Sequence, residues 1–464
     1  MSAPAFIPSP EQKQVIDHRG DHLQVIACAG SGKTESISRR VAALISEGTP
    51  PESIVAFTFT EKAAAELKDR VYQRVEDVKG TDFLGRLGPM FVGTIHSYCF
   101  HLLQDHVPQY GNYDVLDQHC HTALISRRRR ELKLENLHAH HWKSIDLFLR
   151  SADVIGNELI PIDSIEGTEI GECYAAYRDM LERYKFLTFG MIIAETVEVL
   201  ETNQAVFNRV QGGITHLIVD EYQDINPAQQ RLIELLSQDP VQLCVVGDDD
   251  QAIYQWRGSD VGNTVDFETR HPDATIIRLE TNRRSRPEIV QSANSFAETI
   301  ENRLEKEMQA QRPSGPVEVC PWAAETPEVE AEMIGDHIQQ LHEEGWRYQD
   351  IAVLFRSVRT SAPPLVAALT QRGIPFNCGG RTGLFAHPEI NHFGELFAWI
   401  AGFSWQDERY GESRPADLTN VVAGLMQSFG LPDAEEDDLR KYFEDWQHWH
   451  TKGNRRVDLV SDFY

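Results

Sequence analysis

The sequence lacks the features that mark secreted, membrane-spanning and metal-cluster proteins. It has seven cysteines, an odd number, and no two of them form a C-x-x-C pair. A disulfide framework, a zinc site or an iron–sulfur cluster is therefore not expected, and a reducing cytoplasm fits best. No stretch of about 20 apolar residues is present, so no membrane span is expected. The opening residues MSAPAFIPSPEQ lack a basic segment followed by an apolar run and do not resemble a secretory signal.

Positive charge is also scarce. The chain has 44 Lys and Arg against 71 Asp and Glu, and its formal net charge is −27. Taken alone, this balance argues against a nucleic-acid binder, because phosphates repel a negative surface. The argument is weak, since binding needs only a local positive or amide-lined track. One dense basic run, four arginines at residues 127–130, is either a solvated helix face or a phosphate contact.

The length of the chain, 464 residues, exceeds what one hydrophobic core supports, so roughly two to four domains are expected. At the start of the chain, short apolar runs alternate with helical patterns. Strands are predicted at Leu23–Ala27, Ile54–Thr58 and Phe91–Ile95, and helices begin near Lys33 and Glu61. This alternation is typical of a parallel sheet.

A helical pattern of mixed charge then occupies residues 100–190. Strand patterns return at Leu217–Val219, Leu243–Val246 and Thr275–Ile277. We therefore expect a helical insertion that interrupts one α/β domain.

A second α/β unit is predicted to begin at Leu279. Thr326 and Pro327 have the pattern of a helix cap and a first helical residue. A strand is predicted at Ile351–Phe355, and Gly373 follows the end of the next helix. The remainder of the chain again follows a helical pattern.

A candidate phosphate site lies at residues 27–34 (ACAGSGKT), between a predicted strand and a predicted helix. Glycines in such a loop let backbone N–H groups turn inward around a phosphate, and the helix N-terminus adds positive potential. Lys33 is suited to reach the β- and γ-phosphates, and the Thr34 hydroxyl is suited to ligate Mg²⁺. The strict pattern has glycine where Ala27 stands, but the strand–loop–helix context still predicts a nucleotide site.

Two adjacent acids, Asp220 and Glu221, end the strand predicted at residues 217–219. A carboxylate at the tip of a strand can hold Mg²⁺, and its neighbour can accept a proton from an attacking water. An Asp-Glu pair alone is weak evidence because such pairs are common on surfaces. Its place after a phosphate loop and before residues 222–224 (YQD) makes it a strong indication of nucleotide hydrolysis.

Three motifs in order resemble the ATPase motifs of UvrD/Rep-like superfamily 1 DNA helicases: AGSGKT at 29–34, VDEYQD at 219–224 and VVGDDDQAIYQWRG at 245–258. Further segments similar to the family are Gln12 with its neighbours, 58–66, 93–97, 279–285, 350–356 and 379–390. The resemblance covers roughly residues 8–395, and its combination of motifs is highly specific. It implies an α/β fold: a RecA-like parallel-sheet P-loop NTPase domain with helical insertions, plus a partial second RecA-like domain.

The resemblance also implies site residues, with ATP between the two RecA-like domains, Mg²⁺ as its cofactor and single-stranded DNA across their tops. It implies that Glu221 is the general base, Gln251 a γ-phosphate sensor and Arg284 an arginine finger. Thr34 and Asp220 are implied as Mg²⁺ ligands. The residues implied to contact ATP are Gln12, Ala29, Gly30, Ser31, Gly32, Lys33, Thr34 and Arg283. Those implied to contact DNA are Thr58, Phe59, Thr94, His96, Tyr254 and Trp256.

Aromatic side chains suit a motor that grips any base, because base–aromatic stacking contributes about 1–3 kcal/mol per base and ignores sequence. The alternative for Phe59 and Trp256 is that they are core aromatics, although polar Gln255 and Arg257 flank Trp256. His96 is alternatively a capping or core histidine.

Three departures from the family pattern stand out. Arg283 occupies the place of an aromatic residue that usually stacks on adenine, although a guanidinium can also stack. Residues 187–190 (LTFG) lack the acids that the family carries after its phenylalanine. After residue 395, nothing resembles the two remaining motifs of the second motor domain. We therefore expect the chain to bind nucleotide but not to unwind DNA by itself.

The leading hypothesis is an ATP-dependent 3′→5′ DNA translocase or helicase. It would act on single-stranded DNA or a 3′-tailed duplex in repair, replication or recombination. The alternative is a partner-dependent ATP- and DNA-sensing module of an anti-phage defence complex, with a nuclease or other protein subunit. A cytoplasmic location without a membrane partner is expected. The expected domains are a first RecA-like domain (1–100 and 190–278), a helical insertion (100–190), a partial second RecA-like domain (279–385) and the start of a second helical insertion (386–464).

Overall fold

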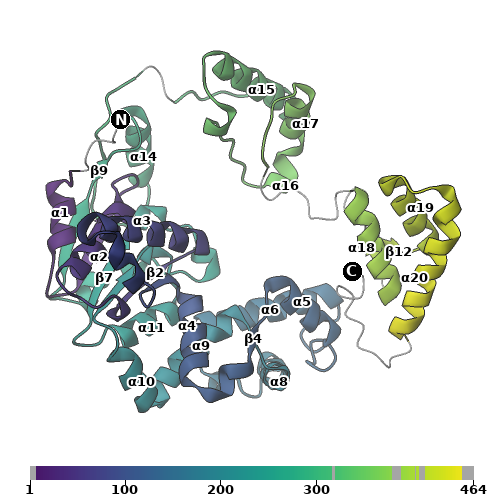
Figure 1. Ribbon diagram of the computed structural model, residues 1–464, viewed down its shortest axis with the longest axis horizontal. Helices are drawn as coiled ribbons and strands as arrows, with labels where there is room; N and C mark the ends of the chain where they lie inside the picture. The colour runs from purple at the N-terminus through teal and green to yellow at the C-terminus, as the bar shows by residue number, and fades with distance from the viewer. Residues whose placement is uncertain (1–6, 316–318, 379–387, 403, 407–412, 452–464) are drawn as a thin grey trace. The chain divides into compact units, whose positions relative to one another are not determined.

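The computed structural model describes residues 7–315, 319–378, 388–402, 404–406 and 413–451 (Figure 1). The chain divides into two compact units, with the boundary between Cys320 and Pro321.

A six-stranded parallel sheet forms the centre of the first unit, in the order β3-β2-β6-β7-β1-β8. Its strands are β1 Leu23–Ala27, β2 Ile54–Thr58, β3 Phe91–Thr94, β6 His216–Val219, β7 Gln242–Gly247 and β8 Thr275–Leu279. All six predicted strands are confirmed, except that Ile95 begins the next helix instead of ending β3.

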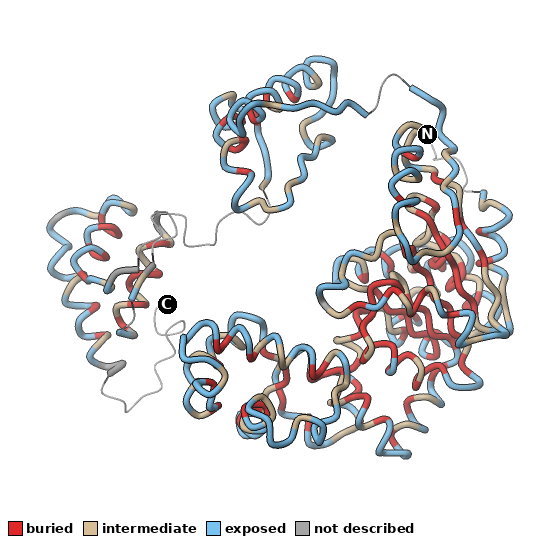
Figure 2. Tube along the Cα trace, turned by 180° about the vertical axis from the view of Figure 1, so that it is seen from behind, coloured by how far each residue is buried: buried red, intermediate tan, exposed pale blue. Residues whose placement is uncertain are grey.

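Two separate hydrophobic cores cover the two faces of this sheet. Ile54 and Ala56 of β2 lie in one core, whereas Val55 and Phe57 lie in the other. The first core includes residues of α2 (Lys33–Ser46) and α3 (Glu61–Lys79), and the second includes residues of the helices α4 (Ile95–His106), α9 (Phe189–Thr202) and α11 (Pro227–Leu236). Because both faces are covered, β1, β2 and β6 are buried along their length, and β7 is buried beyond its first residue. The edge strands β3 and β8 are partly exposed. Figure 2 shows the buried residues in red.

The predicted helical insertion lies between β3 and β6. Beyond α4 it contains α5 Gln118–Arg127, α6 His141–Asn157, α7 Ile162–Ile165, α8 Glu169–Tyr184, α9 and α10 Gln204–Gln211. Two short parallel strands that were not predicted, β4 Asp114–Val115 and β5 Phe186–Leu187, tie its ends together.

The basic run at residues 127–130 is not one helix face, because α5 ends at Arg127. Arg128 donates to the Tyr184 hydroxyl at 2.7 Å, and Arg129 donates to Ser144 Oγ at 3.0 Å. Two of the four arginines therefore hold the insertion together.

Residues 279–320 belong to the first compact unit. The Leu279 carbonyl accepts from the Cys28 N–H at 3.0 Å, and the Arg283 N–H donates to the Gly30 carbonyl at 2.9 Å. The division between the compact units lies about forty residues beyond Leu279, where the second RecA-like domain is predicted to begin. That domain assignment remains a prediction. The remaining elements of this unit are α1 Pro10–Asp17, α12 Gly262–Val265, α13 Phe267–Arg270, β9 Thr281–Asn282, α14 Pro287–Ala297 and β10 Gln309–Ala310.

The second unit is mainly helical. Its elements are α15 Pro327–Glu343, α16 Val358–Ser361, α17 Pro363–Gln371, α18 Pro388–Ala401, β11 Ser404–Gln406, β12 Ser413–Pro415, α19 Leu418–Phe429 and α20 Glu436–Thr451. The predicted cap is confirmed: the Thr326 side chain accepts from the Val329 N–H, and Pro327 is the first helical residue. Gly373 follows α17 with a φ of 66°, as predicted.

The strand predicted at Ile351–Phe355 is wrong. Among the described residues no segment pairs with it, and the Leu354 side chain is 92% exposed. An apolar run becomes a strand only when a neighbouring strand satisfies its backbone groups, so periodicity alone was an insufficient guide. Within the described ranges, no helix is long and apolar enough to cross a membrane.

Candidate nucleotide and nucleic-acid site

Three loops meet at the carboxyl edge of the central sheet. The phosphate loop follows β1, Asp220 and Glu221 follow β6, and residues 248–251 follow β7, which lies between the other two strands. Ligands of parallel α/β sheets bind at this edge. The contact between Lys33 Nζ and Glu221 Oε2, at 2.8 Å, joins the first two loops across 188 residues of sequence.

The phosphate loop depends on two glycines with left-handed backbone. Gly30 has a φ of 68° and Gly32 a φ of 89°. A Cβ on Gly32 would lie 2.7 Å from the Gln12 side chain, so the loop also lacks space for a larger residue. Gly32 caps α2 without a side-chain hydrogen bond to the first turn. The first amides of α2 are therefore suited to an anion.

Gln12 and Arg283, both implied to contact ATP, meet at the phosphate loop. The Gln12 side chain is 1% exposed and donates to the Ser31 carbonyl at 2.9 Å. Arg283 Nη1 donates to the same carbonyl at 2.9 Å. Ser9 caps α1 and fixes Gln12 through a reciprocal capping box.

Lys33, Asp220 and Glu221 shift one another's pKa values through their charges. Burial alone would lower the pKa of Lys33, but Glu221 and Asp220 raise it above its usual value. Burial raises the pKa of Asp220, and the charge of Glu221 adds to this effect. Burial opposes ionisation of Glu221, but Lys33 and Gln223 hold its pKa below the usual value. Glu221 is therefore an ionised carboxylate that can accept a proton.

The backbone of Glu221 is unusual, because its φ of 52° and ψ of 46° lie in the left-handed region. A non-glycine residue in this region costs of order 1–3 kcal/mol and needs support from its surroundings. The Glu221 N–H donates to Asp220 Oδ1 at 3.0 Å, and its side chain accepts from Gln223 at 2.9 Å. These contacts fix the direction of the carboxylate.

The donor set fits Mg²⁺. Thr34 is the second residue of α2 and is half-buried, and Asp220 lies at the tip of β6. A hydroxyl and a carboxylate are the hard oxygen ligands that Mg²⁺ takes beside substrate phosphates. The buried Ser31 hydroxyl in the same loop has no hydrogen-bond partner among the described residues, which suits a phosphate oxygen as its acceptor.

Arg284 lies beside the phosphate loop and is exposed. A Cβ added to Gly30 would meet the Arg284 Cβ and Asn282 Oδ1, each at 2.9 Å. Asn282 Oδ1 accepts hydrogen bonds from the backbone N–H groups of Arg284 and Ser285. These bonds form a turn in the chain at Arg284.

Three implied DNA contacts form a row of aromatic rings. The Phe59 and Tyr254 ring centroids are 4.9 Å apart, and those of Tyr254 and Trp256 are 6.5 Å apart. Phe59 is half-buried, whereas Trp256 is 74% exposed. Trp256 is therefore not a core aromatic.

The other implied DNA contacts are less accessible. Thr58 and Thr94 are 4% and 8% exposed, and Thr94 caps α4. The cap of α4 is thus Thr94 and not His96. The His96 ring contacts the exposed Phe189 ring, with centroids 5.5 Å apart. Burial lowers the pKa of His96 to about 4, so the ring is neutral at pH 7.

Of the residues that connect the loops, sequence reasoning identified Gln251 but missed Gln223 and Lys306. Gln223 is 1% exposed; it donates to Glu221 and accepts from the Asp248 N–H at 3.0 Å. Gln251 donates to Asp248 Oδ2 at 2.5 Å. Lys306 contacts Asp248 as well. One sequence feature could have indicated Lys306: three consecutive acids follow a buried strand, and buried acids require nearby cations.

A parallel sheet with a phosphate loop after β1 and an acid pair after β6 defines a P-loop NTPase domain. Residues 8–272 match the UvrD/REP helicase N-terminal domain, and residues 277–401 match the UvrD-like helicase C-terminal domain. The chain therefore belongs to the UvrD/REP helicase family.

The relatives carry helicase names. "ATP-dependent DNA helicase UvrD1" of Mycobacterium leprae is 32% identical over 418 residues, which cover 84% of this chain and 52% of the relative. The protein of the same name in Mycobacterium tuberculosis is 33% identical over 405 residues, 82% of this chain and 51% of the relative. "ATP-dependent DNA helicase PcrA" of Staphylococcus aureus is 31% identical over 391 residues, 82% and 52% of the two chains. The chain thus spans about half the length of these relatives.

Proposed function

We propose that this chain forms the ATP-hydrolysing, strand-gripping part of a DNA translocase or helicase that moves 3′→5′ on single-stranded DNA. The observation that carries the proposal is the short connection between the two sites. Gln251 contacts Asp248 at the carboxyl edge of the central sheet. It is three residues before Tyr254 and five before the exposed Trp256. If Gln251 contacts the γ-phosphate, only two residues separate that contact from Tyr254, the nearest member of the aromatic row in the sequence.

In the proposed ATP hydrolysis, each step is assigned to a residue at the carboxyl edge of the central sheet. Lys33 binds the β- and γ-phosphates, and Glu221 accepts a proton from the attacking water. Thr34 and Asp220 would hold Mg²⁺, which supplies charge neutralisation on the phosphates. Arg284 stabilises the charge that develops on the transferred group.

Removing the phosphate-loop lysine should abolish most nucleotide affinity. Lys33→Ala loses charge-assisted hydrogen bonds, each of about 1.5–3 kcal/mol, so the Kd for a fluorescent ATP analogue should rise about 10–100-fold. Lys13→Ala is the control, because Lys13 is exposed and pairs with Asp17 on α1. Equal affinity of Lys33→Ala and the wild type would show that the nucleotide binds elsewhere.

The aromatic row should dominate strand binding. Trp256→Ala should weaken binding of single-stranded oligonucleotides by about 1–3 kcal/mol, with similar losses for homopolymers of different base, because stacking ignores sequence. Trp346→Ala is the matched control, since Trp346 is also exposed but lies on the second unit. A loss equal for both variants, or none for Trp256→Ala, would contradict the proposal.

The polarity and the substrate are tested together on the purified chain. ATP hydrolysis should be stimulated by single-stranded DNA more than by blunt duplex. A 3′-tailed duplex should stimulate it more than a 5′-tailed duplex of the same sequence does. Neither the described residues nor the comparisons favour the alternative of a partner-dependent sensing module in anti-phage defence.

A further inference from the structure

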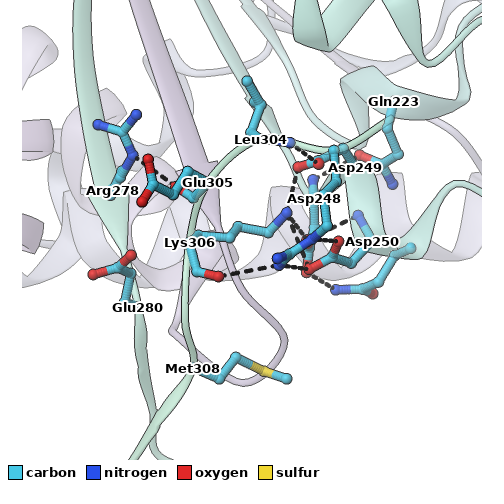
Figure 3. Close-up of polar contacts among 12 residues, drawn as sticks. Gln223, Asp248, Asp249, Asp250, Arg278, Glu280, Leu304, Glu305, Lys306 and Met308 are labelled. Atoms are coloured by element: carbon cyan, nitrogen blue, oxygen red, sulfur yellow. Dashed lines mark hydrogen bonds and ion pairs between the residues drawn. The ribbon is translucent and has the colours of Figure 1, made fainter. Parts of the chain in front are cut away.

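A buried lysine holds the three acids that follow β7 (Figure 3). Lys306 Nζ lies 3.3 Å from Asp248 Oδ1, 2.5 Å from Asp249 Oδ1 and 3.1 Å from Asp250 Oδ2. The side chains of Lys306, Asp248 and Asp249 are at most 3% exposed. We call Lys306 and these three acids the lysine cluster.

Neighbouring residues complete the pairing of the lysine cluster. Arg303 donates twice to Asp250, at 2.9 Å each, and the Leu304 N–H donates to Asp249 Oδ2 at 2.7 Å. Burial would lower the pKa of Lys306, but its bond to Asp249 and the three carboxylates raise it above its usual value. Lys306 is therefore charged.

Stability alone is a weak explanation for this arrangement. Removing charges from water is costly, and a buried ion pair often stabilises a protein no more than apolar residues of similar volume would. What the ion pairs do provide is a fixed direction for each carboxylate oxygen.

Two hydrogen-bond paths lead from the lysine cluster to the catalytic residues, and both run through Asp248. Its Oδ2 accepts from Gln251, while Oδ1 faces Lys306. Its N–H donates to Gln223, which in turn donates to Glu221.

Lys306 also lies on the segment that carries Arg284. The Gln309 N–H donates to the Glu280 carbonyl at 2.9 Å, so the two ends of the segment move together. Through Lys306 the position of this segment is coupled to the position of Asp248.

We propose that Lys306 is a positioning residue for ATP hydrolysis, which holds Asp248 so that Gln251 and Glu221 point at the reacting phosphate only when the segment of Arg284 is in place. This inference rests on the proposed ATPase function.

The test is a double-mutant cycle in the full chain, measured as DNA-stimulated ATP hydrolysis. Lys306→Met keeps the length and loses the charge, and kcat should fall about 10–100-fold, as is typical when a partner that orients a functional group is removed. The KM for ATP should change little. The double variant Lys306→Met, Asp248→Asn should be no slower than Asp248→Asn alone, because Lys306 acts on both paths through the Asp248 side chain.

The controls separate positioning from packing. Lys306→Arg keeps the charge and should recover most of the rate. Arg278→Met should be close to wild type, because Arg278 is exposed and donates to the Glu305 carbonyl of the same segment, at 3.3 Å, rather than to the acids of the lysine cluster.

If Lys306→Met does not fold, a second pair of variants tests whether the lysine cluster acts by positioning Asp248. Asp248→Asn should lower kcat more than Asp249→Asn does, although Asp249 lies closer to Lys306. If the lysine cluster served stability alone, Asp249→Asn should lower kcat more than Asp248→Asn does. Additive losses in the cycle, or the reverse order of the two Asp variants, would overturn the inference while leaving the ATPase intact. No ATP hydrolysis by the wild type would instead refute the proposed function.

Discussion

Glu221→Gln should bind Mg·ATP at least as tightly as the wild type while hydrolysing it about 10²–10⁴-fold more slowly. The amide keeps the shape of the carboxylate but is a far poorer base. It also releases Lys33 from an ion pair of 2.8 Å, so the lysine is more available to the phosphates. Equilibrium binding of an ATP analogue and single-turnover hydrolysis measure the two effects separately.

The control for this variant is Glu234→Gln. Glu234 is a partly exposed acid on α11 that pairs with Arg231, so its loss should leave both quantities near wild type. Hydrolysis by Glu221→Gln within a factor of about ten of the wild type would assign the base to another group. The nearby candidate is Asp224, where burial raises the pKa to about 6.

Arg284→Ala should give the largest loss of rate, because an arginine finger contributes about 10³–10⁵-fold to phosphoryl transfer. Its Cβ lies beside Gly30 of the phosphate loop, and the residue is exposed. ATP affinity should change much less than turnover, since the finger acts on charge that develops in the transition state. Stopped-flow phosphate release under single-turnover conditions is the appropriate measurement.

Two further variants define what the finger supplies. Arg284→Lys keeps one positive charge without the planar fork and should recover only part of the rate. Arg312→Ala removes a 3.0 Å hydrogen bond to the Arg284 carbonyl and tests whether local packing alone explains the loss. If Arg312→Ala were as slow as Arg284→Ala, the finger assignment would be wrong.

The structural features that depend on one short segment were the most predictable from the sequence. The strands β1 and β2 match the apolar runs at Leu23–Ala27 and Ile54–Thr58, because a buried parallel strand needs apolar side chains on both faces. The phosphate loop was predictable for a related reason. Left-handed backbone at Gly30 and Gly32 and a lysine at the helix start are all requirements of one short segment.

Features that depend on distant partners were not predictable. Lys306 has nothing in its neighbouring sequence that indicates a buried cation, and its partners are about sixty residues away. The run at Ile351–Phe355 has the composition of a strand, but strand formation depends on a neighbour that periodicity does not reveal. The contacts of residues 279–320 with the phosphate loop likewise follow from the three-dimensional fold and not from any local pattern.

The strand order of the central sheet also affects how the chain can fold during synthesis. The first strand of the sheet to be synthesised, β1, pairs with β7 and β8, which are the last two. At about 5–20 residues per second, a ribosome needs on the order of tens of seconds to reach β8 after finishing β1. Until β7 is made, the apolar residues of β1 lack both neighbouring strands, and until β8 is made they lack one of them. During this time they are open to aggregation. The nascent chain is therefore expected to depend on chaperones until residue 279 has emerged, and a truncation before β7 should be insoluble although it contains the entire phosphate loop.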